Sequence, residues 1–159
     1  MRWTLKTTPN ITTVQQLSKD LSIDDTLSKL LVQRGVSTFE EAKKFFRPSL
    51  EELHDPFLLK DMDLAVSRIE KAIASNENIL IYGDYDVDGT TSVSLVASYL
   101  KTITTSISTY IPDRYDEGYG ISYQGVDFAA DNNFSLIIAL DCGIKAIDKV
   151  AYATKKKVD

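Results

Sequence analysis

The chain has 159 residues, of which 43% are hydrophobic and 26% charged, and its formal net charge is −5 at pH 7. This length suits one domain, or one domain with a helical extension, and the hydrophobic share can furnish a core. The acidic balance gives no global attraction for nucleic acid. No apolar stretch approaches the ~18 residues of a membrane span and no signal-peptide pattern opens the chain, so we expect a cytoplasmic protein without membrane association.

Helix signals fill the first part of the chain. The start signals are Asp24 or Asp25 and then Thr38 with Glu41, spaced as a capping box, and the stop signals are Gly35 and Pro48. A longer helix follows, with an apolar stripe from Met62 to Ile73 that should pack against a sheet. We therefore expect residues 1–76 to form a helical N-terminal extension that packs on the sheet of the next domain.

Strand and helix patterns alternate in residues 77–159. The expected strands are 79–82, 106–111 and 135–140, and the expected helices are 90–101, 122–132 and 144–154. This alternation is typical of an α/β fold with a mostly parallel sheet and flanking helices.

Three alternating aspartates follow the first expected strand. Asp84, Asp86 and Asp88 come directly after Ile79–Gly83 and are closed by Gly89. In an extended backbone, carboxylates at this spacing point to one side, roughly 6.5 Å apart. Their mutual repulsion would raise their proton affinities, whereas a divalent cation favours the ionised cluster. The segment therefore predicts a metal site.

Two other interpretations compete for this segment. The spacing matches the opening of an EF-hand loop, but Leu95 stands where that loop needs its bidentate glutamate, and a strand rather than a helix precedes it. Alternatively, Asp88 caps the following helix in a solvated turn. Three aspartates in alternation favour the metal site over a single cap.

A second strand also ends in an aspartate. Asp141-Cys142-Gly143 follows the expected strand 135–140. Because parallel strands present their carboxyl ends to one edge of the sheet, Asp141 could approach the first cluster, although a helix-cap role is also open. Cys142 is the only cysteine, which excludes an internal disulfide, and we expect it to be a buried small residue rather than a nucleophile.

The connection after the second strand has the composition of a ligand-facing loop. Residues 110–120 contain Arg114, Tyr119, Gly118 and Gly120. Arginine can fork onto a phosphate and tyrosine can stack on a base, although a structural loop explains the same residues.

These three segments together resemble one family. Residues 82–89, the loop from Ile111 to Gly120, and Asp141-Cys142-Gly143 resemble the DHH phosphoesterase superfamily, and within it the bacterial RecJ single-strand-specific exonucleases. The acidic motif is shared across the superfamily, whereas the Glu117-Gly118-Tyr119-Gly120 loop is more specific to RecJ. The resemblance covers most of the chain.

The resemblance implies a Mn²⁺- or Mg²⁺-dependent hydrolase with a two-metal site that degrades single-stranded DNA from 5′ to 3′ in DNA repair and recombination. It places Asp86, Asp88 and Asp141 at metal-ligand positions, and Asp84 either as a ligand or as a support for the ligands. It also places Arg114, Gly118, Tyr119 and Gly120 toward DNA. Other superfamily members have a histidine where this chain has Tyr82.

The family's Asp-His-His motif is not found in this sequence, so we expect a fragment that is nearly inactive in isolation. Two further functions remain open. One is another DHH phosphoesterase that acts on short oligonucleotides or cyclic dinucleotides, and the other is a non-catalytic DNA-binding scaffold of the same fold.

Overall fold

The computed structural model describes residues 2–4, 6–7 and 9–159. They form two compact units, which are divided between Leu58 and Leu59. The sequence placed this boundary after residue 76. It lies earlier because helix α4 (Met62–Ala74) packs with the sheet, where Ala72 joins Ile79 and Leu136 in one buried cluster. Within the described residues, no helix is long and apolar enough to cross a membrane.

The first unit is helical. It contains α1 (Ile11–Leu21), α2 (Asp25–Val32) and α3 (Phe39–Phe46), followed by the short 3-10 turns Leu50–Glu52 and Pro56–Leu58. Asp24 caps α2, and Thr38 with Glu41 forms the expected capping box of α3. Leu17, Leu31, Val36 and Ala42 form the core of this unit.

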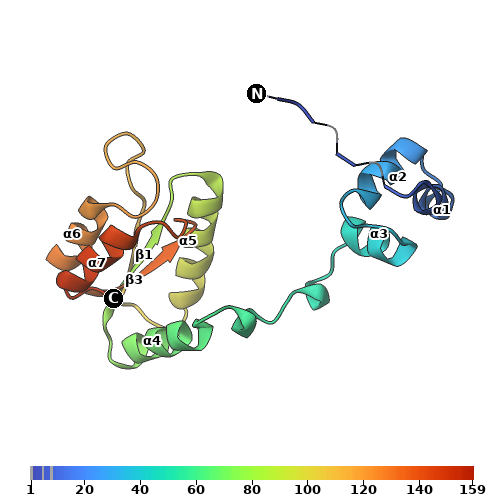
Figure 1. Ribbon diagram of the computed structural model, residues 1–159. Helices are drawn as coiled ribbons and strands as arrows, with labels where there is room; N and C mark the ends of the chain where they lie inside the picture. Colours follow the sequence, from blue (N-terminus) through green and yellow to red (C-terminus); the bar gives the residue numbers. More distant parts are fainter. Residues whose placement is uncertain (1, 5, 8) are drawn as a thin grey trace. The chain divides into compact units, whose positions relative to one another are not determined.

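The second unit is a three-layer α/β/α arrangement. Its parallel sheet has the order β2-β1-β3, with strands Asn78–Gly83 (β1), Ile107–Tyr110 (β2) and Phe134–Leu140 (β3). Its other helices are α5 (Val87–Leu100), α6 (Tyr123–Asp131) and α7 (Ile147–Lys155). Figure 1 shows α6 and α7 on one side of the sheet and α5 on the other. The expected α/β class and parallel sheet are confirmed.

The central strand β1 is buried on both faces. Ile81 packs with Val93 and Ala97 of α5, whereas Leu80 packs with residues of α6 and α7. This is the alternation of a strand with period two, and both of its faces are apolar because helices cover both. Burial on both sides fixes the register of β1 and therefore the position of the residues that follow it.

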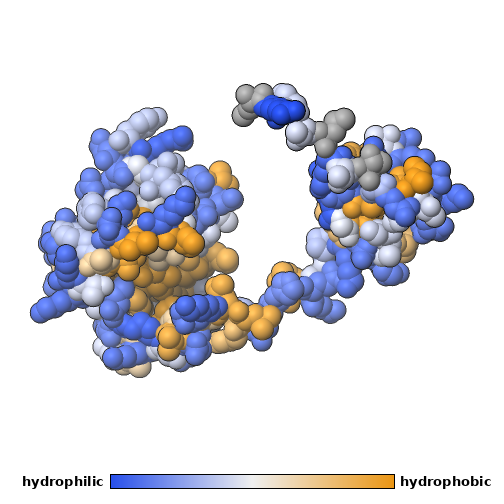
Figure 2. Space-filling view, in the orientation of Figure 1, coloured by the Kyte–Doolittle hydropathy of each residue, from blue (hydrophilic) through white to orange (hydrophobic). Residues whose placement is uncertain are grey.

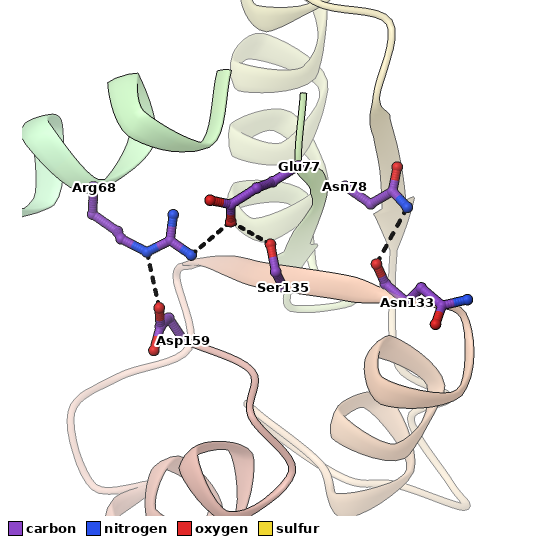
Figure 3. A network of polar contacts seen from close by, with 6 residues as sticks. All are labelled: Arg68, Glu77, Asn78, Asn133, Ser135 and Asp159. Carbon is purple, nitrogen blue, oxygen red and sulfur yellow. Dashed lines mark hydrogen bonds and ion pairs between the residues drawn. The ribbon is translucent and has the colours of Figure 1, made fainter. Parts of the chain in front are cut away.

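A polar network closes the edge of the sheet away from the strands' carboxyl ends. In Figure 3, Arg68 of α4 contacts Glu77 at 2.8 Å and Asp159 at 2.9 Å, and the Ser135 hydroxyl donates to Glu77 at 2.5 Å. Backbone hydrogen bonds also join Asp159 to Ser135 and Ile137 of β3. The residues after α7 therefore lie alongside β3.

An apolar groove lies between α4 and α5. Its lining includes Ile69 and Ile73 of α4, Leu95 and Tyr99 of α5, and Ile138 of β3. Figure 2 shows apolar surface on this unit as an orange area. The groove is separate from the carboxyl ends of the strands, where the polar residues singled out in the sequence gather.

Candidate metal centre

Asp84 occupies the first position after β1. Its side chain is only 1% exposed, and its Oδ1 accepts a hydrogen bond from the Gly120 backbone N–H at 3.3 Å. A buried carboxylate needs such donors, because an unpartnered charge is costly away from water. Asp84 thereby joins the end of β1 to the loop that follows β2.

The backbone turns into helix α5 much sooner than expected. The helix begins at Val87 rather than at residue 90, so the chain does not remain extended from Asp84 to Asp88. The prediction that the three carboxylates share one face of an extended segment is therefore wrong. Asp86 is the N-cap, and its Oδ1 accepts from the Gly89 N–H at 2.9 Å, whereas Asp88 lies exposed in the first helical turn.

Two glycines make this tight turn possible. A Cβ on Gly89 would lie 2.3 Å from the Asp84 backbone oxygen, and a Cβ on Gly83 would lie 2.3 Å from a Val93 methyl group. Only a residue without a side chain allows the helix backbone to approach the strand end so closely. Gly89, together with Asp86 as the N-cap, is thus also a structural requirement of the strand-to-helix turn.

Asp141 lies at the end of β3 on the same edge of the sheet. It is exposed and has a left-handed backbone conformation, with φ of 55°. Partial desolvation and, to a smaller extent, repulsion from Asp86, Asp88 and Asp84 raise the pKa of Asp141. Gly83 pairs with Leu140 in the parallel sheet, so Asp84 and Asp141 follow the two strands at the same edge, close to Asp86 and Asp88 at the start of α5.

The fit of these residues to a metal ion is partial. Carboxylate oxygens are the ligands that Mg²⁺ and Mn²⁺ favour. In residues 2–4, 6–7 and 9–159, however, no three histidine, cysteine, aspartate or glutamate side chains gather tightly enough to hold an ion. One oxygen of Asp86 is also engaged in capping α5. The donor chemistry fits, but the carboxylates do not converge on a common point.

Tyr82 organises the wall of this edge, which sequence reasoning did not anticipate. Its side chain is fully buried, and its hydroxyl donates to the Gly120 carbonyl at 2.9 Å and accepts from the Ser122 N–H at 3.1 Å. Its ring stacks on Tyr110 at 5.2 Å. Burial raises the pKa of Tyr82 to about 12, so the hydroxyl remains a donor at neutral pH.

Glu117 is the second organising residue that sequence reasoning missed. Its carboxylate accepts from the Tyr110 hydroxyl at 2.9 Å, from the Asp113 backbone N–H at 2.8 Å, and from the Ser122 hydroxyl. These bonds tie the loop to β2 and to the start of α6. The available signal was a glutamate beside two glycines, in a loop whose backbone donors need acceptors.

Some of the residues expected to face DNA have accessible side chains, whereas others shape the backbone of the loop. The Arg114 guanidinium lies 5.2 Å from the Tyr85 ring centroid, and Tyr119 is 61% exposed. Gly118 and Gly120 both have φ of 78°, and a Cβ on Gly120 would press on the Cys142 carbonyl at 3.0 Å. Arg114 and Tyr119 are therefore accessible, whereas Gly120 is needed for the backbone path.

Cys142 is buried, as expected, and sits beside the acidic residues. Burial and the carboxylates of Asp84 and Asp141 raise the pKa of its thiol to about 11. A thiol with a raised pKa is a poor nucleophile, because little thiolate is present at neutral pH.

The fold and this edge define the chain as a parallel α/β protein with carboxylates at the ends of neighbouring strands. The chain belongs to the DHH family, because the model of "DHH family, N-terminal domain" matches residues 78–159, just over half of its length.

Curated relatives are single-stranded-DNA-specific RecJ exonucleases. The Bacillus subtilis protein is 39% identical over 159 residues, which is 100% of this chain and 20% of that protein. The Dickeya dadantii protein is 35% identical over 126 residues, or 79% of this chain and 21% of that protein. The chain thus spans about a fifth of the length of these relatives.

Solved structures of RecJ share the fold. A crystal structure of exonuclease RecJ bound to manganese matches with a TM-score of 0.58 and 28% identity, over 64% of this chain and 26% of that one. The structure of RecJ from Thermus thermophilus in complex with Mn²⁺ matches 99% of this chain and 22% of that one, with a TM-score of 0.67 and 21% identity.

Proposed function

We propose that this chain is part of a metal-dependent exonuclease that hydrolyses phosphodiester bonds of single-stranded DNA in the 5′ to 3′ direction, in repair and recombination. The names of its relatives support the substrate, and the manganese-bound RecJ structures support a divalent cation. Within this fold, the aspartates at the strand ends are the side chains that would bind the cation and so act on the DNA.

The observation that carries the proposal is the gathering of carboxylates at the strand ends. Asp84 and Asp141 follow paired residues of β1 and β3, and repulsion from Asp86, Asp88 and Asp84 adds to the desolvation that raises the pKa of Asp141. Four carboxylates without a compensating cation make the ionised edge unfavourable, and a divalent ion reverses this.

Asp86, Asp88 and Asp141 would hold the ion or ions, Mn²⁺ or Mg²⁺, with Asp84 as a further ligand or as a support. Asp84 suits the supporting role, because it is buried and already accepts a bond from Gly120. When bound, a pair of such ions supplies an activated water and neutralises charge on the attacked phosphate. The close packing of Gly89 on the Asp84 backbone fixes where α5 begins, and therefore the backbone positions of Asp86 and Asp88.

The loop after β2 supplies the DNA-handling groups. Arg114 can reach a phosphate with its planar fork, and its stacking on Tyr85 limits the conformations that it must lose on binding. Partial burial and the carboxylates of Asp141 and Asp84 raise the pKa of Tyr119, which places this exposed ring beside the acidic edge. Gly118 and Gly120 shape the backbone that presents the ring.

A chimera tests this function. The 159 residues replace the matching segment of the Bacillus subtilis relative, and a 5′-labelled single-stranded oligonucleotide is incubated with the chimera and Mn²⁺. We expect release of mononucleotides, and its loss in Asp88→Asn. A folded chimera that binds DNA but does not cleave it would contradict the proposal and favour a scaffold role. Cleavage restricted to short oligonucleotides would favour another phosphoesterase.

A further inference from the structure

A cavity of about 390 Å³ opens beside the acidic edge. It lies between the loop after β2, represented by Tyr119 and Ile121, and the segment that leads from β3 into α7. Its volume is within the range of small-molecule pockets, roughly 300–1,000 Å³. The cavity shares a wall with the candidate metal centre, because the Tyr119 hydroxyl contacts the Asp141 carbonyl at 3.4 Å.

Two lysines line this cavity although carboxylates crowd the neighbouring edge. They are Lys145, which is exposed, and Lys149, which is partly buried with its Nζ 5.9 Å from the Tyr123 ring centroid. In the described part of the chain, neither lysine forms an ion pair, whereas Lys44 and Lys156 do. The positive charge of the cavity is therefore available to an anion from solution.

The start of α7 adds to this positive charge. The helix begins at Ile147, and its N-cap residue Ala146 provides no side-chain cap. The first backbone N–H groups of a helix have no intrahelical acceptor and carry the positive end of the dipole. Asp148 in the first turn offsets part of this effect, so the lysines remain the main attraction.

The remaining walls suit a base rather than a second charge. Ile121, Ile144 and Ala146 line the cavity, and Ile144 is 94% exposed at its rim. Tyr119 offers an exposed ring on the side of the acidic edge. Apolar side chains together with an aromatic ring bind bases without regard to sequence, because every base has a π-face.

We infer that this cavity is a nucleotide subsite, in which Lys145 and Lys149 hold the backbone phosphate of the nucleotide next to the one at the acidic edge. Tyr119 and Ile144 flank the base of that nucleotide. The inference rests on the proposed function, since it takes the substrate to be single-stranded DNA. The shared wall allows one strand to span both places, with one phosphate at the carboxylates and its neighbour at the lysines.

Binding of a fluorescent single-stranded oligonucleotide tests this subsite, measured by anisotropy in EDTA at several salt concentrations. We expect Lys145→Gln and Lys149→Gln each to reduce the salt slope by about 0.7, the value for one phosphate contact on a single strand. Tyr119→Ala should weaken binding about tenfold without changing the slope, because it removes stacking and no charge. Lys101→Gln, at the C-terminal end of α5, is the matched control and should change neither quantity.

A competition arm separates a strand from a free nucleotide. We expect a deoxynucleoside monophosphate or inorganic phosphate to compete far more weakly than an unlabelled oligonucleotide. Equal effects of Lys101→Gln and the two cavity lysines, no binding by the chain, or competition by the monophosphate alone would each overturn the subsite.

The EDTA condition keeps this test apart from the test of the proposed function. A chimera that fails to cleave while the lysine variants still lower the salt slope would reject the hydrolase and retain the subsite. Cleavage by the chimera, together with unchanged DNA binding in the lysine variants, would retain the hydrolase and reject the subsite.

Discussion

Two parallel strands end in aspartate at the same sheet edge, but their ends are built differently. After β1, Asp84 is buried and hydrogen-bonded, Asp86 caps α5, and Gly89 packs directly on the Asp84 backbone. After β3, Asp141 is exposed in a left-handed conformation, and helix α7 begins only at Ile147.

The difference assigns separate tasks to the two ends. At the end of β1, Asp84 and Asp86 stabilise the fold in addition to any role in ligand binding. Substitutions there therefore affect stability and function together. At the end of β3, the exposed Asp141 carboxylate contributes little to packing, and its effect on stability is mainly electrostatic. Variants that separate packing, capping and charge can therefore test the comparison.

The largest effect on stability is expected at the tightly packed turn after β1. Gly89→Ala should lower the free energy of unfolding by about 3 kcal/mol, because the new Cβ would lie 2.3 Å from a backbone oxygen that cannot move aside. The higher helix propensity of alanine would offset only about 1 kcal/mol of this loss. Urea unfolding followed by circular dichroism measures the change.

Gly118→Ala is the matched control for this variant. Nothing lies within 4 Å of the position that its new Cβ would take, so only the φ of 78° opposes the substitution. That conformation costs roughly 1 kcal/mol for a residue with a side chain. Equal losses in the two variants would show that close packing at the β1 end has no special role.

The next effect concerns the buried hydroxyl that supports the edge. Tyr82→Phe should cost about 2 kcal/mol, because the Gly120 carbonyl and the Ser122 N–H lose their partner while buried. Tyr119→Phe, at an exposed tyrosine, should change stability by less than about 0.5 kcal/mol. Similar values for both would mean that the Tyr82 hydroxyl is replaced by water.

A smaller effect separates capping from charge at Asp86. Asp86→Ala should destabilise the chain by about 1 kcal/mol through loss of the N-cap bond to Gly89. Asp86→Asn keeps a capping oxygen and should change stability by less than about 0.5 kcal/mol. A metal role predicts that both variants lose Mn²⁺ binding, whereas a purely structural role predicts normal binding in Asp86→Asn.

Sequence patterns were sufficient for the parts of the fold that depend on local periodicity. The apolar runs of β1 and β3 predicted parallel strands, and the Thr38 and Glu41 pair predicted a capping box that the structure confirms. The start of α5 was predicted three residues too late, with Asp88 as the candidate cap, because any of the three aspartates has a side chain that can cap a helix. Only the approach of Gly89 to Asp84 selects Asp86.

The candidate site was predicted as a set of residues but not as a geometry. Parallel-sheet logic placed Asp141 near the aspartates after β1, which its raised pKa reflects. The roles of Tyr82 and Glu117 depend on contacts with Ser122, 40 and 5 residues away. The Tyr82 pairing is set by tertiary packing and has no local signal, whereas the local signal for Glu117 was a glutamate in a glycine-containing loop whose backbone donors need acceptors.

The electrostatic effect at Asp141 should appear as a pH dependence. Its raised pKa means that the folded state binds a proton more tightly than the unfolded chain, so this group favours folding below pH 3.8. The contribution is lost as the pH rises through the folded pKa. Asp141→Asn should therefore stabilise the metal-free chain at pH 7 but not at pH 3, as thermal unfolding at both values would show.

The same repulsion should make the chain sensitive to divalent ions. Millimolar Mn²⁺ should raise the melting temperature of the unsubstituted chain at pH 7, because an ion that binds only the folded state stabilises it. The increase should vanish in Asp141→Asn, and Asp148→Asn, seven residues further along the chain, serves as the control. An equal increase in all three proteins would attribute the effect to nonspecific binding.

Direct titration of Mn²⁺ tests the central claim, that the aspartates after β1 and β3 form one divalent-metal site. Free Mn²⁺ is measured by electron paramagnetic resonance as the chain is added, with Asp88→Asn, Asp141→Asn and the control Asp148→Asn alongside. We expect saturable binding that is weakened at least tenfold in both site variants and is unchanged in the control. Equal affinity in all four proteins would contradict it.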